Sequence, residues 1–303
     1  MSEMVETTAE PLFDPTSPLT ASGNLQRRNI VNRLAESAAT GAALLAVAVL
    51  GIVTFTVIKR GIGAISWDFL TKNPPAFGTG GGIAPAIVGT IIISALATAI
   101  AMPIGVLIAL FLTEFSGTRV ARVIRLALDL LNGIPTIVVG VFVFGLLVAG
   151  HQQSAFAGAL ALAIIMLPLI ARSTQEVLLL VPKSLRDAAD ALGVTRWRSI
   201  KGVIIPTAMG GIVTATVLAM ARAAGETAPL LLVCSIYGNT VQVNPFGHTL
   251  ANIPVTIFTL SEQADAGGVT RAWGAALVLL TVILLANIGA RALLARSRAK
   301  ITQ

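Results

Sequence analysis

Residues 83–113 read IAPAIVGTIIISALATAIAMPIGVLIALFLT and contain no charged side chain. The hydrocarbon core of a bilayer is crossed by roughly 20 apolar residues in a helix, and by more when the helix is tilted. This stretch is therefore predicted to cross a membrane as one helix. Pro103 lies inside it, where a proline removes a backbone N–H and bends the helix, so neighbouring helices must support the bend.

The same pattern recurs along the chain and sets the predicted fold class. Hydrophobic residues make up 55% of the chain and charged residues 12%, and the mean hydropathy is +0.86. A soluble domain has about a quarter charged residues, so most of this surface must face lipid. We therefore predict an all-α, polytopic membrane protein of about six transmembrane helices. The apolar runs cover residues 38–58, 83–113, 123–149, 155–170, 207–236 and 273–294.

The runs follow one another closely, so the sequence predicts one membrane domain between two tails. We expect a disordered tail at residues 1–35, the first helix at 36–60, the main transmembrane domain at 61–296 with the connection 171–206 inside it, and a second tail at 297–303. Sixteen of the 21 Lys and Arg residues fall in tails and connections on one side of the membrane, and four fall on the other. Because basic residues concentrate on the cytoplasmic side, both termini are predicted to be cytoplasmic, in the plasma membrane.

Charge and residue types exclude several classes of function. The net charge of +7 comes from basic residues at the ends of apolar runs, so nucleic acid is not an expected partner. Cys234 is the only cysteine, and His151 and His248 fall in predicted loops, so we expect neither a disulfide nor a metal site. The sequence has no G-x-x-x-x-G-K-[ST] nucleotide-binding motif and no recognisable catalytic set. No catalytic residue and no directly bound cofactor are therefore predicted.

The connection at residues 171–206 has the pattern of a short amphipathic helix. Ser184 is a candidate N-cap with Asp187 three positions later, and Gly193 suits the left-handed residue that ends a helix. Between them an apolar stripe repeats at helical spacing: Leu185, Ala188, Ala189 and Leu192. Such a helix suits docking into a groove of a partner protein, and it equally suits lying on lipid or on its own bundle.

The spacing within this loop matches a known signature. Asp187-Ala188-Ala189, Gly193 and Val203-Ile204-Ile205-Pro206 resemble the EAA signature of ATP-binding-cassette importer permeases, with Asp187 in place of the usual Glu. The resemblance implies a coupling-helix loop that inserts into a separate ATPase subunit, so ATP is used by the partner. The residues implied in this loop are Leu185, Asp187, Ala188, Ala189, Leu192, Gly193 and Pro206.

Three further segments resemble the phosphate permeases of the Pst type, in particular the A-type subunit. They are residues 81–90 (GGIAPAIVGT) followed by 103–105 (PIG), residues 132–140 (NGIPTIVVG) and residues 222–229 (RAAGETAP). The similarity covers roughly residues 60–295 and leaves out the N-terminal tail. It implies import of inorganic phosphate by a complex of this chain with a homologous permease subunit, two copies of an ATPase subunit and an extracytoplasmic phosphate-binding protein.

Charged residues inside the predicted spans are candidates for the substrate pathway, because a charge at the bilayer centre costs about 2.5–3.5 kcal/mol on insertion scales. Arg222 lies within the fifth run, and Glu226 is expected one turn later on the same helix face. The guanidinium suits phosphate oxygens, and Glu226 would neutralise it at rest; a structural ion pair is the alternative. Asp129, close to Arg125, and Arg172 are weaker candidates, for which a structural pair and a membrane anchor are the favoured roles.

Other functions compete with phosphate import. They are a permease for sulfate, molybdate or phosphonate, an ion-coupled secondary carrier with Arg222 and Glu226 as its relay, and a membrane-embedded enzyme. A secondary carrier does not need a docking helix of this spacing, and an enzyme lacks its catalytic groups here.

On the outer side, the connection at residues 237–272 carries an apolar patch at 253–258 that is too short to span. This patch must be re-entrant or packed on the membrane domain.

Overall fold

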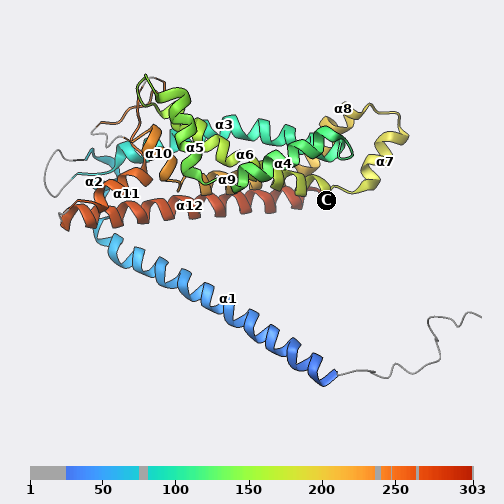
Figure 1. The fold of residues 1–303 in the computed structure, drawn as a ribbon, viewed down its shortest axis with the longest axis horizontal. Helices are drawn as coiled ribbons and strands as arrows, with labels where there is room; N and C mark the ends of the chain where they lie inside the picture. The colour runs from blue at the N-terminus through green and yellow to red at the C-terminus, as the bar shows by residue number, and fades with distance from the viewer. Residues whose placement is uncertain (1–24, 75–80, 236–239, 247, 264–265, 302–303) are drawn as a thin grey trace, which may run out of the picture. The chain divides into compact units, whose positions relative to one another are not determined.

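A computed structural model describes residues 25–74, 81–235, 240–246, 248–263 and 266–301, and within these ranges every regular element is helical (Figure 1). Five described helices are long and apolar enough to cross a membrane. They become six if the bent pair α4 (Arg119–Gly133) and α5 (Thr136–Val143) counts as one span. The predicted all-α, polytopic membrane fold of about six spans is confirmed.

The long helices are α1 (Leu25–Gly61), α3 (Ala84–Glu114), α6 (Ala155–Leu179), α9 (Ile205–Ala223) and α12 (Ala266–Ile301). The described residues fall into two units, divided between Phe55 and Thr56. α1 begins inside the predicted tail 1–35, whose first 24 residues lie outside the described ranges. α12 likewise continues into the predicted tail 297–303. In both places the sequence lacks the glycine or proline that would end a helix.

Short helical elements join the spans. They are η1 (Ile62–Ala64), α2 (Trp67–Thr71), the π-helical turn η2 (Phe144–Val148), α7 (Lys183–Ala191), α8 (Arg196–Ser199), the π-helical turn η3 (Ile200–Ile204), α10 (Ala228–Val233) and α11 (Ile253–Ser261). α11 contains the apolar patch of the outer connection, and Ile253 and Val255 are buried. The Thr90 hydroxyl of α3 accepts a hydrogen bond from the Ile253 N–H at 2.8 Å. The patch is therefore packed on the membrane domain.

Two predicted apolar runs are broken. The run 123–149 bends by 100° between α4 and α5. This break falls at Ile134-Pro135, because proline lacks the N–H that would continue the helix and disfavours a helical residue before it. The run 207–236 ends as α9 at Ala223 and restarts as α10, which carries Pro229 in its first turn. Hydropathy averaged over a run does not reveal either break, since apolar helices lie on both sides of each.

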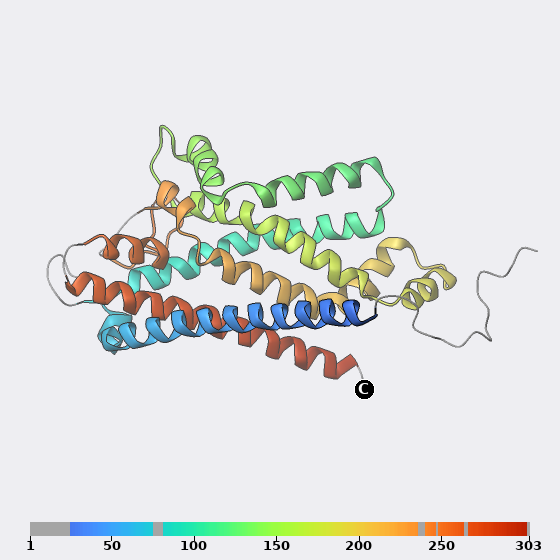
Figure 2. The same ribbon diagram turned by 60° about the horizontal axis from the view of Figure 1, so that its bottom comes forward.

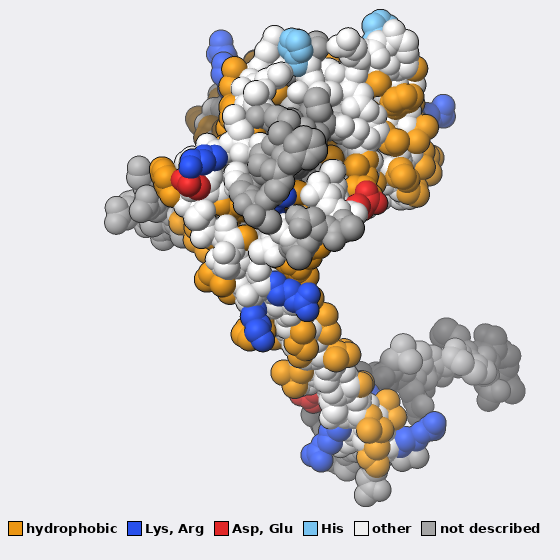
Figure 3. All heavy atoms as spheres, turned by 90° about the vertical axis from the view of Figure 1, so that its left-hand side faces the viewer, with side chains coloured by type: hydrophobic (Ala, Val, Ile, Leu, Met, Phe, Trp, Pro, Cys, Tyr) orange, Lys and Arg blue, Asp and Glu red, His pale blue; other side chains and the backbone are white. Residues whose placement is uncertain are grey.

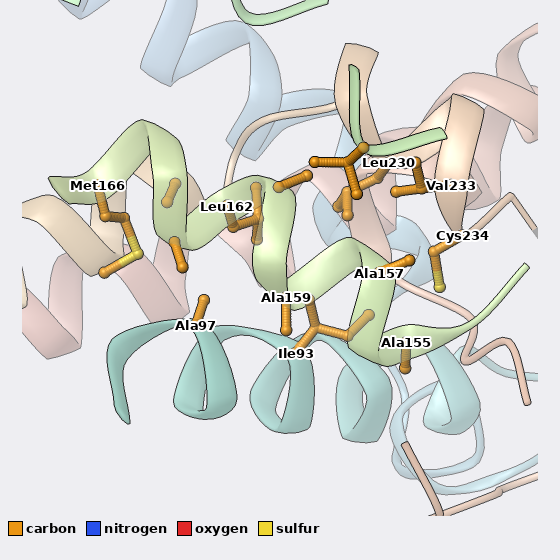
Figure 4. Packing of buried hydrophobic residues seen from close by; sticks show 14 of the residues in the cluster. Ile93, Ala97, Ala155, Ala157, Ala159, Leu162, Met166, Leu230, Val233 and Cys234 are labelled. Atoms are coloured by element: carbon orange, nitrogen blue, oxygen red, sulfur yellow. The ribbon is translucent and has the colours of Figure 1, made fainter. Parts of the chain in front are cut away.

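α3 and α6 are at the centre of the unit formed by residues 56–303 and lie side by side in both ribbon views (Figures 1 and 2). Their contact is built from small side chains, and Figure 4 shows Ala97 of α3 facing α6 near Ala159, with Ile93 beside them. Small residues let helix backbones approach closely, which favours association in lipid. A methyl group on Gly105 would lie 2.8 Å from the Ile170 side chain, so the close approach continues along α3.

Candidate functional site

α7 occupies the loop 171–206, where the sequence predicts a short helix, but it begins differently. Pro182 is the N-cap residue, and no side chain caps this helix. The Pro182 ring fixes φ at −54°, which leads the chain into the first turn without a hydroxyl cap. Ser184 lies inside that turn and is exposed. The prediction that Ser184 is the N-cap is wrong.

The end of α7 is as predicted from Gly193. This residue has φ +66°, in the left-handed region that side chains other than glycine rarely adopt. Its N–H donates to the Asp190 carbonyl at 3.0 Å, and the Val194 N–H donates to the Ala189 carbonyl at 3.0 Å. These bonds satisfy carbonyl groups that the end of a helix otherwise leaves unpaired. Gly193 therefore fixes both the length of α7 and the direction in which the chain leaves it.

The apolar stripe of α7 divides between the interior and the surface. Ala189 is buried, whereas Ala188 is exposed, Leu185 is 39% exposed and Leu192 is 81% exposed. Trp197 of the neighbouring α8 adds another large apolar side chain, 64% exposed. α7 projects beyond one end of the helices α3 and α4, and α8 lies next to that end (Figure 1). This end of the chain thus presents apolar side chains that its own bundle does not cover.

An ion pair ties α7 to the bundle. Arg186 pairs with Glu114, the last residue of α3, and a second guanidinium nitrogen donates to the Leu178 carbonyl of α6 at 3.3 Å. The Glu114 side chain is only 9% exposed. The two residues are 72 positions apart, so helical periodicity does not detect the pair. The sequence does carry one sign of this contact: Glu114 is an acidic residue directly after an apolar run whose other flanking charges are basic.

A cavity of about 530 Å³ lies beside this ion pair, between the ends of α3, α4 and α6. Arg172 and Asp129 form an ion pair on its wall, with side chains 49% and 51% exposed. Asp129 thus pairs with Arg172 of another helix, while its sequence neighbour Arg125 donates to the Leu112 carbonyl at 3.4 Å. The lining residues are Leu112, Thr113, Ser116, Arg125, Leu128, Asp129, Arg172, Gln175, Glu176 and Leu179.

The structure thus brings two of the predicted pathway residues together in one polar cavity. Arg125, Gln175 and Glu176, which the sequence did not single out as site residues, complete its charged and amide lining. Two cations and two carboxylates share the walls, so the cavity can offer donors to an anion while remaining near neutrality when empty. The ion pair is half-exposed and is worth about 0–1 kcal/mol, so an anion can replace Asp129 as the partner of Arg172 at little cost.

Arg222 and Glu226 are arranged differently from the prediction. α9 ends at Ala223, and Glu226 lies in the turn before α10, so the two residues do not share one helix face. Arg222 is exposed and Glu226 half-buried, and no ion pair joins them in the described part of the chain. Arg222 lies next to the end of the span Arg196–Ala223, at the end away from α7. It is therefore not in the middle of a continuous apolar run.

The opposite end of the bundle carries a cavity with a polar lining. This second cavity, of about 340 Å³, is lined by Gln152, Gln153, Gln242, His248 and Thr249. His248 and His151 are exposed, and the two histidines are visible on the face shown in Figure 3. No group of three or more His, Cys, Asp or Glu residues within the described ranges is arranged to hold a metal ion. Both histidines lie in loops, as predicted, and His248 is one of the polar residues that line the cavity.

Comparison with known proteins is consistent with this geometry. Residues 101–299 match the family of binding-protein-dependent transport system inner membrane components. The phosphate transport system permease protein PstA 1 of Mycobacterium tuberculosis (strain CDC 1551 / Oshkosh) is 36% identical over 290 residues, covering 94% of this chain and 95% of the relative. PstA of Xylella fastidiosa (strain Temecula1 / ATCC 700964) is 38% identical over 283 residues, covering 92% and 98%.

Solved structures show the same fold at low sequence identity. A chain of the MetNI methionine ABC transporter, in an inward-facing conformation, has a TM-score of 0.57 and 18% identity, covering 71% of this chain and 94% of that chain. A chain of a bacterial ABC transporter for the acidic polysaccharide alginate has a TM-score of 0.54 and 18% identity, covering 86% and 98%. The chain therefore belongs to the family of binding-protein-dependent transport system inner membrane components, the membrane-spanning permeases of ABC transporters.

Proposed function

We propose that this chain is the permease subunit of an ATP-driven importer of inorganic phosphate. It would work with a homologous permease subunit, two copies of an ATPase subunit and an extracytoplasmic phosphate-binding protein. Phosphate is favoured over sulfate, molybdate or phosphonate because relatives named as phosphate transport permeases match at 36–38% identity along nearly the whole chain. An ion-coupled secondary carrier is not favoured, since it would have no use for α7.

The observation that carries the proposal is the surface of α7. Leu185, Ala188 and Leu192 are exposed on a helix whose end is fixed by Gly193 and whose inner side is fixed by Ala189. Exposed apolar side chains on a helix of fixed length suit a groove in a soluble partner better than they suit water. We therefore assign α7 as the coupling helix that docks into the ATPase subunit, with the α7 end and both termini on the cytoplasmic side.

Two places along the bundle supply cations for an anionic substrate. Arg222 lies near the end of the span away from α7, and an exposed arginine there must face a partner or a water-filled path and not lipid. Arg172, opposed by Asp129, lies on the wall of the cavity close to α7. We propose that phosphate passes between the two permease subunits and meets Arg222 first and Arg172 last. The planar guanidinium can bind two phosphate oxygens at once at each place.

The proposal is tested by the substitution Ala188→Glu in the assembled complex. Ala188 is exposed, so the free chain should fold and insert normally, whereas the added carboxylate would be buried in the ATPase groove. We expect the ATPase subunit to be lost from purified complexes together with phosphate uptake. Gly117→Glu adds the same side chain in the exposed connection between α3 and α4, where a Cβ would meet nothing within 4 Å, and should leave both unchanged. Undiminished ATPase binding and uptake in the Ala188→Glu variant would remove the docking role.

A further inference from the structure

We propose that the ion pair between Arg186 and Glu114 is the strut that transmits movement of α7 to the wall of the phosphate pathway. The proposal rests on the proposed function, because it assigns a role to residues that hold the coupling helix. Arg186 and Glu114 are positioning residues here, since they do not line the cavity near Arg172. They connect the element that would meet the ATPase with the helices that enclose the substrate.

The first observation is that few side chains of α7 are described in contact with the bundle. Ala189 is the only buried residue of this helix, all of which is described, and Arg186 is the only one whose side chain makes a described ion pair. Ala189 is a small side chain and contributes a single methyl group to packing. Besides the packing of Ala189, the described polar contacts that hold α7 on the bundle are those of the Arg186 guanidinium.

The second support is the pair of groups that this guanidinium reaches. One nitrogen binds Glu114 at the end of α3, and the other donates to the Leu178 carbonyl near the end of α6. Only the flat, forked donor set of arginine can hold both acceptors in a fixed direction, whereas an ammonium group acts as a single point. Arg186 thus joins three helices, and a displacement of α7 must pull or push α3 and α6 together.

The third observation is that residues at the ends of α3 and α6 form part of the cavity wall. Thr113 and Ser116, on either side of Glu114 in the sequence, line the cavity that contains Arg172, and Leu179 follows Leu178 into the same wall. The Glu114 carboxylate is 9% exposed, so it is costly to leave without its partner. Separating Arg186 from Glu114 therefore costs free energy. A movement of α7 is thus passed on to α3 instead of breaking the ion pair.

The test measures phosphate transported per ATP hydrolysed by the complete complex in proteoliposomes, for Arg186→Met, Glu114→Gln and the double variant. We expect each single variant to assemble and hydrolyse ATP, while the phosphate-to-ATP ratio falls roughly tenfold or more. Because the two residues act as one unit, the double variant should lose no more than a single variant. Arg186→Lys should retain part of the ratio, and Arg119→Met, which removes an exposed cation outside α7 and outside the cavity lining, should retain all of it.

Three results would overturn the inference. They are an unchanged ratio in the single variants, losses that multiply in the double variant, and a fall in assembled complex that accounts for the whole loss of uptake. The wild-type complex separates this inference from the proposed function. If it shows no ATP-driven phosphate uptake, the proposed function fails; if it transports phosphate and the Arg186 variants keep its ratio, only the strut fails.

Discussion

Substituting Gly193 tests whether the geometry of α7, and not only its composition, supports coupling. Gly193 has φ +66°, and a Cβ atom built there would meet nothing within 4 Å. A side chain therefore costs no space, and its whole effect comes from the backbone. A left-handed conformation costs a residue other than glycine about 1–2 kcal/mol, and asparagine tolerates it better. At about 1.4 kcal/mol per factor of ten, Gly193→Val should lower the equilibrium constant for the correctly ended α7 by about 5- to 30-fold, which is the upper bound on the loss of binding.

The matching assay is binding of the purified ATPase subunit to the membrane complex, followed by ATP-driven phosphate uptake. Gly193→Val should weaken binding within that range, and Gly193→Asn should weaken it less. Gly117→Val is the control, because Gly117 also has open space around its Cβ position but does not have a positive φ. Equal binding by the Gly193→Val variant and the wild-type chain would show that the end of α7 does not position a docking surface.

Three further outcomes are expected. Arg222→Gln and Arg172→Gln should each abolish most phosphate uptake without loss of assembly, and Lys at either place should restore only part, as measured with radiolabelled phosphate; full activity of a Gln variant would remove that arginine from the pathway. Gly89→Ala should lower the yield and melting temperature of the protein, because its Cβ would lie 1.9 Å from a backbone oxygen; a melting temperature like that of the wild type would contradict this packing. An impermeant thiol reagent should label Gln152→Cys but not Asp190→Cys in intact cells, while the buried native Cys234 stays unreactive, and the reverse pattern would invert the proposed orientation.

Much of the fold could be predicted because lipid imposes simple rules. Long uncharged runs must be helical, and this accounts for α3, α6 and α12. The runs could not show where the backbone breaks. Pro103 stays inside α3, whereas Pro135 ends a helix with a 100° bend, although both are prolines among apolar residues. The difference depends on neighbouring helices, which the local sequence does not contain.

Some features of the candidate site could likewise be predicted from the local sequence, and others could not. Gly193 was predictable, because a left-handed helix end is a local property. The Ser184 cap was a reasonable local prediction that failed, since Pro182 already sets the start of the helix. The pairing of Arg172 with Asp129 joins residues distant in the chain, and periodicity along one helix carries no information about it. The sequence predicts Arg222 and Glu226 on one helix face, because hydropathy does not show that α9 ends at Ala223.

The central claim is that this chain moves phosphate only when a partner hydrolyses ATP. The direct measurement is uptake of radiolabelled phosphate into proteoliposomes that contain this chain, its partner permease and the ATPase subunit, with the phosphate-binding protein added on the extracytoplasmic side. We expect uptake that requires ATP on the cytoplasmic side, stops when the ATPase subunit is omitted and persists when ion gradients are collapsed. Uptake that follows an ion gradient and continues without ATP would contradict it.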